Sequence, residues 1–502
     1  MGAAVSAWQL AKAVALTGQL GVVSGTGLDA VLCRRLQLGD PEGHIRRALD
    51  HFPLSDTAER VRDRYFIEGG KDRDRPFVVG PKPGQRLAAE TVELLVVANF
   101  AEVFLAKEGH AGLVGINYLE KIQTVLLPSL FGAMLAGVDY VLVGAGIPRA
   151  VPGALDRLSV GESVEMPLHV EGATSEDSFT SCFDPHAFFP GITFPINRPR
   201  FLAIVSSTTL ATMLAKKANG RVDGFVVEGA SAGGHNAPPR GAVKYNQRGE
   251  PIYTHRDMVN LSVFRSLGVP FWLAGSYGAA SHLAEALDEG AAGIQVGTAF
   301  AFCQESGLEE TIKHGAIEMA RRRMADVLTD PLVSPTGFPF KVFQYPETLS
   351  DQSVYQRRRR VCDLGYLRHA YRMADGSIGW RCPAESPEMY AEKGGDASDT
   401  HGRKCLCNAL LATVGLEQAR PDGSREPPLV TCGDDVDQIT RFLPTPESGT
   451  YTARDVVTGL LAEYRPRDPA HGGRTSDPEE DEPHHAASGA RFSAAVLGET
   501  VG

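Results

Sequence analysis

The sequence predicts an α/β protein built on a (β/α)8 TIM barrel, and two observations predict it. Short β-branched runs alternate with helical stretches, which is the pattern of βα units around a parallel sheet. These runs also end in small or polar residues on their carboxyl side, for example at Asn117, Ser206 and Gly297. In a barrel those strand ends form one face, which carries the chemistry. An open doubly wound sheet is the alternative, but it gathers ligand contacts at one switch point and not at many strand ends.

Seven strands of the buried, continuously apolar type are expected. They cover residues 20–25, 112–119, 138–146, 201–207, 222–229, 270–276 and 293–300. Helices are expected between them, among them residues 126–137 and 208–220, the second running from a threonine cap to a terminal glycine. Because a barrel of this class has eight strands, we expect the first strand either to lie upstream of Met1 or to be missing from an incomplete barrel.

Three parts of the chain differ in character. Residues 1–339 hold the predicted barrel, with a turn-rich insertion at 40–110. Residues 340–462 follow the last barrel strand and are expected to form a cysteine-containing appendage. From residue 463 the chain is polar and rich in proline and glycine, without periodicity. That composition predicts a disordered tail over 463–502.

The composition limits the class of protein and its partners. A chain of 502 residues with 43% hydrophobic and 22% charged residues is typical of a soluble globular protein. Its formal net charge of −11 disfavours nucleic acid and anionic membranes as partners. The most apolar window, residues 92–106, contains Glu93, Asn99 and Glu102 and is too short to span a membrane. Eight cysteines in a chain this long do not form a secreted disulfide framework, so we expect a cytoplasmic protein. A homo-oligomer is compatible with the sequence.

The last two predicted strands are followed by turns made of small residues. "LAGSYGAASH" runs from a strand through a glycine-rich turn into a helix that starts near Ala279, and "VGTAF" ends the next strand. Small residues let backbone N–H groups approach an anion, and paired turns after strands 7 and 8 are the usual phosphate site of such barrels. Gly275, Ser276, Gly297 and Thr298 are therefore candidate phosphate-binding residues; the alternative is that these glycines only permit tight turns.

The stretch "VVEGASAGGHN" combines small residues with one titratable side chain, His235. The small residues that follow Glu228 are expected to let a flat ligand lie against the backbone. An imidazole titrates near pH 6.5 and can act as an acid or a base at neutral pH. His235 is therefore the candidate catalytic residue, and the alternative is a surface histidine in a flexible glycine loop.

Four of the eight cysteines lie within 46 residues, at Cys362, Cys382, Cys405 and Cys407. Thiolates that cluster in this way are typical of sites for soft metals such as zinc. The spacing lacks the usual Cys-x-x-Cys pairs, and cysteine also serves as a small buried apolar residue. Both interpretations stay open, and no metal ligand is assigned to the predicted active site.

Several of these stretches resemble the nitronate monooxygenase family, formerly called 2-nitropropane dioxygenases. They are "EGASAGGHN", "LAGSYGAASHLAEALDEGAAGIQVGTAF", "SPTGFPFKV", "VGINYLEKIQ" and "GAMLAGVDYVLVGAGIP", and the resemblance covers about residues 1–345. It implies an FMN-dependent barrel that oxidises alkyl nitronates with O₂ to carbonyl compounds and nitrite. The 40–110 insertion and the 340–440 region resemble a longer subgroup of the family.

The resemblance also implies roles for individual residues. Asn117 matches a strand-end residue near the flavin, and Ser206 stands where some members have a lysine beside the cofactor. His235 matches the proposed base. The implied cofactor contacts are Asn117, Ser206, Gly229, Gly233, Gly234, Gly275, Ser276, Gly297 and Thr298. Because relatives of the family reduce enoyl thioesters or quinones with NAD(P)H, that activity is an alternative. A non-catalytic flavin-binding partner protein is a third.

Overall fold

The fold centres on a curled parallel sheet, seen in a computed structural model that describes residues 2–464. The sheet has seven strands in the order β1-β2-β3-β7-β8-β9-β10, and every neighbouring pair runs parallel. The strands are β1 (Gly21–Ser24), β2 (Val114–Leu119), β3 (Tyr140–Gly144), β7 (Arg200–Val205), β8 (Gly224–Glu228), β9 (Phe271–Ala274) and β10 (Gly293–Gln295). The predicted fold class and the seven expected strands are therefore confirmed.

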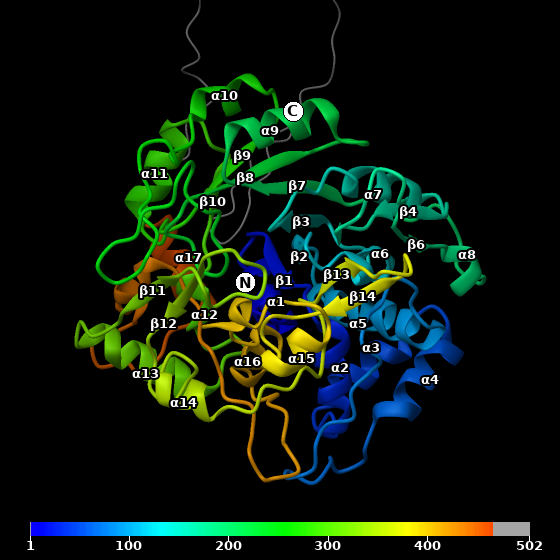
Figure 1. Cartoon of the computed structure of the whole chain (residues 1–502). Coiled ribbons are helices and arrows are strands. Elements are labelled where there is room, and N and C mark those ends of the chain that lie inside the picture. Colours follow the sequence, from blue (N-terminus) through cyan, green and yellow to red (C-terminus); the bar gives the residue numbers. More distant parts are fainter. Residues whose placement is uncertain (1, 465–502) are drawn as a thin grey trace, which may run out of the picture.

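Helices surround the outer side of the sheet (Figure 1). Those before β7 are α1 (Trp8–Ala15), α2 (Leu28–Gln37), α3 (His44–Asp50), α4 (Ser55–Tyr65), α5 (Ala89–Lys107), α6 (Gln123–Leu135), α7 (Val151–Ser159) and α8 (Pro185–Phe188). Those after it are α9 (Thr208–Lys217), α10 (Leu261–Ser266), α11 (Ala280–Asp288), α12 (Thr298–Ala301) and α13 (Glu310–Arg321). Buried residues of the strands and helices together form one large apolar core.

Two sequence-based details are corrected by the structure. The strand expected over 293–300 ends at Gln295, and helix α12 begins at Thr298, because the chain leaves the sheet after Gln295 and Gly297 is already the N-cap of the helix. The helix after β7 is capped by Ser207 and not by a threonine: the Ser207 hydroxyl accepts a hydrogen bond from the backbone N–H of Leu210. A side-chain oxygen at this position satisfies one of the free N–H groups at a helix start.

Residues 40–110 contain the helices α3, α4 and α5. Helix α5 includes the apolar window of residues 92–106 and is buried along most of its length. It packs against α1, α2 and α6, so it belongs to the helical layer of the barrel itself. No helix in residues 2–464 is long and apolar enough to cross a membrane.

The sheet is not closed between β1 and β10. Residues 3–6 lie beside β1 as turns and form no strand: the backbone N–H of Ser24 donates to the carbonyl of Ser6, and the Ser6 hydroxyl donates to the carbonyl of Val22. On the other side, the N–H of Gly307 donates to the carbonyl of Val5. This segment therefore fills the gap where an eighth strand would pair.

Three small sheets lie outside the parallel sheet, and the chain after β10 also adds a set of short helices. β11 (Val327–Asp330) pairs with β12 (Phe340–Phe343), the hairpin β13 (His369–Arg372) and β14 (Ile378–Arg381) adds β5 (Val170–Glu171), and β4 (Val164–Pro167) pairs with β6 (Thr180–Phe183). The helices are α14 (Gln352–Arg357), α15 (Pro387–Glu392), η1 (Ala397–Thr400), α16 (Leu406–Ala412), η2 (Asp434–Phe442) and α17 (Ala453–Leu461). Residues 465–502, where most of the predicted tail falls, lie outside the described residues.

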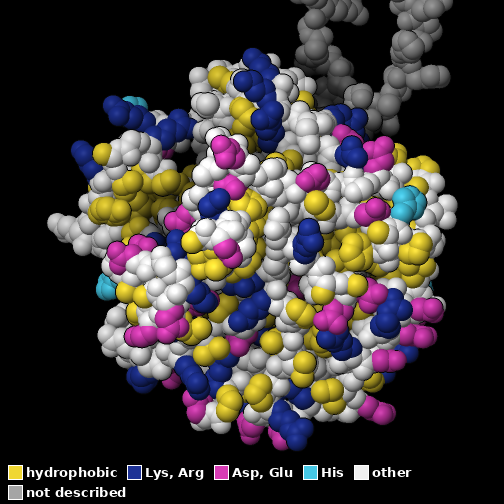
Figure 2. All heavy atoms as spheres, turned by 45° about the vertical axis from the view of Figure 1, so that its right-hand side comes forward, with side chains coloured by type: hydrophobic (Ala, Val, Ile, Leu, Met, Phe, Trp, Pro, Cys, Tyr) yellow, Lys and Arg dark blue, Asp and Glu magenta, His cyan; other side chains and the backbone are white. Residues whose placement is uncertain are grey.

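Residues 340–462 pack onto the barrel. Helix α17 contacts both α1 and α11 and so covers the open side of the sheet, while η2 packs on α12 and α13. On the face seen in Figure 2, basic and acidic side chains are interspersed.

Candidate active site

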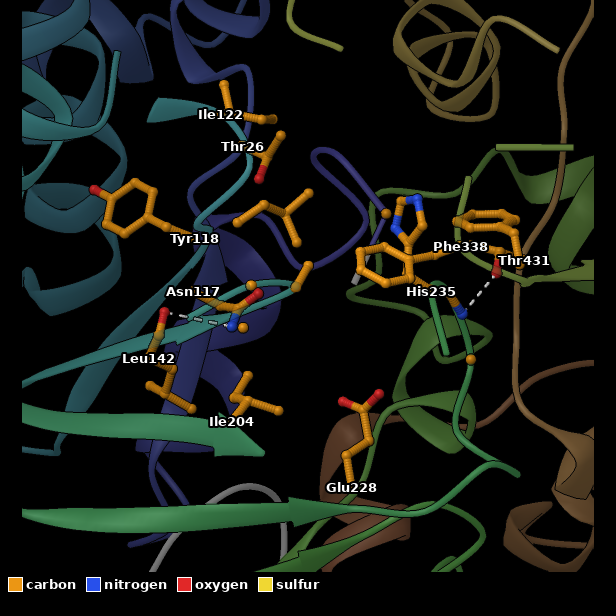
Figure 3. A pocket seen from close by; sticks show the side chains of 18 of the residues that line it. Thr26, Asn117, Tyr118, Ile122, Leu142, Ile204, Glu228, His235, Phe338 and Thr431 are labelled. Atoms are coloured by element: carbon orange, nitrogen blue, oxygen red, sulfur yellow. Dashed lines mark hydrogen bonds between the residues drawn. The ribbon is translucent and has the colours of Figure 1, made fainter. Parts of the chain in front are cut away.

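A cavity of about 360 Å³ opens at the carboxyl ends of the parallel strands. Strand-end residues of the sheet line it, among them Asn117, Ser206, Glu228 and Gly297, and Figure 3 shows several of these side chains around it. Leu142 and Ile204 form part of an apolar wall. Binding sites for small molecules and cofactors have volumes of about 300 to 1,000 Å³ and mostly apolar walls with a few polar groups. The cavity has the size and character of such a site.

A second cavity, of about 140 Å³, adjoins the first and shares residues such as Glu228, Gly233 and Gly297 with it. The predicted phosphate turns line it: Gly275 and Ser276 follow β9, and Gly297 and Thr298 follow β10. Both Gly275 and Ser276 have positive φ, at 100° and 57°. This left-handed conformation turns successive backbone N–H groups toward a common point, as in anion-binding nests.

The N–H groups of these turns are available to a ligand. Those of Ser276, Tyr277 and Gly278, and those of Gly297 and Thr298, donate to no other residue in the described part of the chain. Helix α11 begins just beyond the first turn, so its positive end lies at the same cavity. The structure thus brings the four predicted phosphate-binding residues together, with five unpaired donors around them.

An acidic side chain that the sequence did not mark also lines this smaller cavity. The chain just before η2 crosses the phosphate turns: the N–H of Gly433 donates to Thr298 Oγ1 at 3.0 Å, and Asp435 lies beside Thr298. A Cβ on Gly278 would lie only 2.9 Å from Asp435 Oδ2. Burial raises the pKa of the Asp435 carboxyl above its ordinary value. A group that can carry negative charge therefore stands beside donors suited to an anion.

His235 lines the larger cavity, as predicted, but its loop is firmly anchored. Its Nε2 lies 2.7 Å from the hydroxyl of Ser334, and its ring packs edge-on against Phe340 at 4.8 Å between centroids. The preceding Gly234 exchanges backbone hydrogen bonds with later segments, through its N–H to Thr431 Oγ1 and its carbonyl to the N–H of Lys341. Burial lowers the pKa of His235 to about 3, so its imidazole is neutral at physiological pH.

Glu228, at the end of β8, faces both cavities, and Figure 3 shows its carboxyl group pointing into the larger one. Burial raises the pKa of Glu228 to about 7. No described residue hydrogen-bonds its carboxyl group. Glu228 is not among the predicted site residues; the signal for it in the sequence is its position at a strand end, in a run of otherwise apolar and small residues.

The small residues of the 229–234 loop serve contacts that sequence reasoning did not anticipate. A Cβ on Gly233 would lie 2.7 Å from the carbonyl carbon of Cys432, so the absence of a side chain admits the protein's own backbone. Gly229 lines neither cavity, because its N–H continues the pairing of β8 with β9 by donating to the carbonyl of Ala274. Gly229 therefore borders no space for a ligand, whereas Gly233 lines both cavities and stays a predicted cofactor contact.

The C-terminal part of the chain forms a cover over the larger cavity. The contributing residues come from the 366–367 loop, helix α16 and the segment before η2, namely Tyr366, Leu367, Leu406, Cys407, Leu410, Leu411 and Thr431. None of these was predicted, because no motif in the sequence relates them to the barrel.

Comparison with known proteins finds a family similar to the central part of the chain. Residues 195–328 match the family model for nitronate monooxygenase. This segment is similar to the nitronate monooxygenase family. It contains β7 to β10 together with Glu228, His235 and both predicted phosphate turns.

Among curated proteins, the chain is similar to an indene-carboxyl-CoA dehydrogenase of Rhodococcus jostii (strain RHA1), named (3aS,4S,5R,7aS)-5-hydroxy-7a-methyl-1-oxo-octahydro-1H-indene-4-carboxyl-CoA dehydrogenase. The two are 28% identical over 141 residues, which is 28% of this chain and 34% of that protein, so the match spans about a third of the relative's length.

Two solved structures are also similar. FabK from Thermotoga maritima has 14% identity and a TM-score of 0.44, with 91% of this chain and 88% of that chain covered. Nitroalkane oxidase from Streptomyces ansochromogenes has 14% identity and a TM-score of 0.43, with coverages of 92% and 93%.

The two cavities together offer a fit for a flavin mononucleotide. The larger cavity has the size and apolar walls that a planar ring needs, and the smaller one presents unpaired N–H donors to a phosphate. Two carboxyl groups that line the smaller cavity, those of Glu228 and Asp435, oppose a dianion there when they are ionised, and burial raises the pKa of both.

Proposed function

We propose that this chain is an FMN-dependent nitronate monooxygenase, which oxidises alkyl nitronates with O₂ to carbonyl compounds and nitrite. The observation that carries the proposal is the position of Glu228 and His235 on one cofactor-sized cavity inside a nitronate monooxygenase domain. FMN, when bound, would supply the redox chemistry between the substrate and O₂. The protein's part is to hold, orient and deprotonate the substrate.

The space for the flavin ring would be bordered by Asn117, by Ser206 and by the wall that Leu142 and Ile204 form. The turns that contain Gly275, Ser276, Gly297 and Thr298 would hold the phosphate through backbone N–H groups, and the first of these turns lies just before the N-terminus of α11. The binding of the cofactor would thus depend mainly on backbone atoms.

Two groups can take part in proton transfer. A general base works best with a pKa near the operating pH, and the pKa of Glu228, about 7, meets that condition. A neutral nitroalkane would lose its α-proton to the Glu228 carboxylate, which leaves the nitronate in the cavity. His235, neutral and held by Ser334, would orient a nitro oxygen by hydrogen bonding. The assignment of His235 as the base, made from the sequence, stays a prediction that is tested together with Glu228.

One observation favours a second candidate function. The Rhodococcus relative carries the name of a dehydrogenase of a CoA thioester, so an NAD(P)H-dependent reductase of enoyl thioesters or quinones is the alternative. The apolar walls of the cavity suit either substrate class.

The deciding experiment uses the purified protein loaded with FMN. Propyl-2-nitronate and air are supplied without nicotinamide, and O₂ uptake and nitrite are measured. Release of nitrite and acetone together with O₂ uptake, in the absence of nicotinamide, supports the monooxygenase. Rapid bleaching of the flavin by NADPH, with reduction of a crotonyl thioester or a quinone and no nitrite, supports the reductase. Bound FMN without either turnover leaves the third alternative, a non-catalytic flavin-binding protein.

A further inference from the structure

Four cysteines of the C-terminal part of the chain meet in one place. Cys362 follows α14, Cys382 follows β14, Cys405 is the N-cap of α16, and Cys407 lies in its first turn. All four line a single small hollow of about 10 Å³. In residues 2–464, no group of three or more histidine, cysteine, aspartate or glutamate side chains is arranged to hold a metal ion. Each of the eight cysteines of the chain is a free thiol, so four oxidisable sulfur atoms share this hollow.

Two of these cysteines, Cys405 and Cys407, are held close together by the chain itself. Only Leu406 separates them, and the backbone is extended at Cys405, just before α16 begins. Consecutive Cα atoms are about 3.8 Å apart, so two residues that flank a third lie about 5 to 7 Å apart. A disulfide requires a Cα separation of about 4.4 to 6.8 Å. The spacing of the pair therefore suits an S–S bond.

The side chains of the pair are also in contact. Cys405 forms a small buried cluster with Cys382, and Cys407 packs against this cluster. Contact with the Cys407 thiol lowers the pKa of Cys405 to about 7 in spite of burial, and the nearby Arg358 adds to the effect. Two thiols in contact share their protons, so the first proton lost belongs to the pair and not to one residue. Near neutral pH the pair thus carries a thiolate, which is the reactive form of cysteine.

Positive charge favours that thiolate. Arg358 is buried within electrostatic reach of Cys405, and its Nε donates a hydrogen bond to Glu426. Its two terminal nitrogens are buried without a hydrogen-bond partner among the described residues. A buried cation with unused donors is costly unless an anion compensates it, and a thiolate at the pair supplies negative charge. Arg368 lines the hollow and lies within electrostatic reach of Cys407.

One thiol of the pair is accessible from the candidate active site. Cys407 is partly exposed and lines both the hollow and the larger active-site cavity, whereas Cys405 is buried and lines only the hollow. Of the four cysteines, Cys407 is the one that borders the larger cavity. A small reactive molecule in that cavity therefore meets Cys407 first, with Cys405 directly behind it.

We propose that Cys405 and Cys407 form a redox-active dithiol, which a hydroperoxide that enters through the active-site cavity oxidises to a disulfide. In the first step the Cys407 sulfur attacks the peroxide. An S–O bond forms and the O–O bond breaks, and the second oxygen takes the thiol proton and leaves as water or an alcohol. Cys407 is then a sulfenic acid, oxidised by two electrons that reduce the peroxide.

In the second step the Cys405 sulfur attacks the sulfenic sulfur of Cys407. The S–S bond forms, the S–O bond breaks, and the hydroxyl group leaves as water with the proton of the Cys405 thiol. Two thiols and one hydroperoxide thus give one disulfide, one alcohol and one water. A dithiol reductant reverses the change by thiol–disulfide exchange.

The disulfide would lie in the wall of the active-site cavity. Leu406, between the two cysteines, and Leu410 and Leu411 of the same helix line that cavity. Oxidation would close a ring around Leu406 and fix the first turn of α16, so the redox state of the pair would act on the cover of the site. The proposal does not depend on the reaction catalysed there, because the thiols are measured chemically and not through turnover.

The test uses the full chain, reduced, freed of reductant and then treated with hydrogen peroxide. Free thiols are alkylated under denaturing conditions, and the tryptic peptides are weighed by mass spectrometry. Lys404 and Arg420 bracket a peptide of residues 405–420, which contains both cysteines of the pair and no other. We expect this peptide to escape alkylation and to be lighter by two hydrogen atoms than its dithiol form. Treatment with dithiothreitol before alkylation should restore both alkylation sites.

The other two cysteines of the hollow serve as internal controls. Cys362 lies in the tryptic peptide 361–368 and Cys382 in 382–393, and both peptides should remain alkylated after peroxide treatment. Two alkylated cysteines in peptide 405–420 of the peroxide-treated chain would overturn the proposal. A disulfide that joins this peptide to either of the other two would overturn the pairing.

Three variants assign the steps. Cys407→Ser should abolish the disulfide. Cys405→Ser should leave the sulfenic acid on Cys407, which dimedone traps as an adduct of peptide 405–420. Cys362→Ser, a change in the same hollow, should leave disulfide formation intact, and its loss there would contradict the assignment. The outcomes for the unsubstituted chain decide the proposal even if a variant fails to fold.

Discussion

The Nε2 atom of His235 lies 2.7 Å from the hydroxyl of Ser334, a residue 99 positions later in the chain. This contact ties the loop after β8 to the segment between β11 and β12, and the edge-on packing of His235 against Phe340 reinforces it. The imidazole is therefore held in place and neutral, whereas the pKa of the Glu228 carboxyl, about 7, makes that group titrate near neutral pH. Four predictions follow from this arrangement and from the turns beside it.

Substitution of Glu228 by glutamine is expected to slow turnover of neutral nitroalkanes about 10²- to 10⁴-fold, the usual contribution of a positioned base. Turnover of preformed nitronates should change far less, because their proton is already gone. Steady-state nitrite release measures both. His235→Asn serves as the comparison. If His235→Asn shows the selective loss and Glu228→Gln does not, the base is His235, as the sequence-based assignment has it.

The pH dependence separates the same two residues without substitution. A base must be unprotonated, so with Glu228 as the base kcat/KM for a neutral nitroalkane should rise about tenfold per pH unit and level off above pH 7. With His235 as the base, the profile should be flat from pH 5 to 9, since burial lowers its pKa to about 3. The profile requires a nitroalkane that itself stays protonated across this range.

The substitution Asp435→Asn is expected to tighten FMN binding about tenfold, which corresponds to roughly 1.4 kcal/mol. It removes a group that, when ionised, repels the phosphate beside Thr298. Quenching of flavin fluorescence during titration of the apoprotein measures the dissociation constant. The matched control is Asp437→Asn, which changes an exposed acid two positions beyond Asp435. It should leave the dissociation constant of FMN unchanged. Weaker binding in Asp435→Asn would show instead that the carboxyl group helps to hold the cofactor.

Gly233→Ala is expected to lower the free energy of unfolding by about 1 to 3 kcal/mol, as overpacking of a filled site does. The new Cβ would meet the backbone of Cys432 at 2.7 Å, and backbone atoms cannot move aside cheaply. Gly229→Ala, whose Cβ would make an ordinary contact of 3.5 Å with the Ala274 carbonyl, should cost much less. Urea denaturation compares the two. Equal losses would mean that the packing of the C-terminal segment against Gly233 is not what the position requires.

The strands of the barrel, and the face on which its candidate site residues gather, could be predicted from the sequence. The alternation of apolar strands and helices depends on local periodicity, so all seven strands were predictable, and the small residues Gly275, Ser276, Gly297 and Thr298 marked the phosphate turns at strand ends. Strand ends of a parallel sheet necessarily meet on one face, which is why Asn117 and His235 could be assigned to a single cavity although 118 positions separate them.

What only the tertiary structure decided are the contacts between segments that share no local pattern. The sequence could not show that Gly233 makes room for Cys432, that Asp435 lies at the phosphate turns, or that four dispersed cysteines surround one hollow. It also could not rank Glu228 against His235, because both pKa values are set mainly by burial, and burial depends on what the distant C-terminal segments cover. Local periodicity determines which elements form, whereas desolvation and long-range packing determine which of their side chains become chemically distinct.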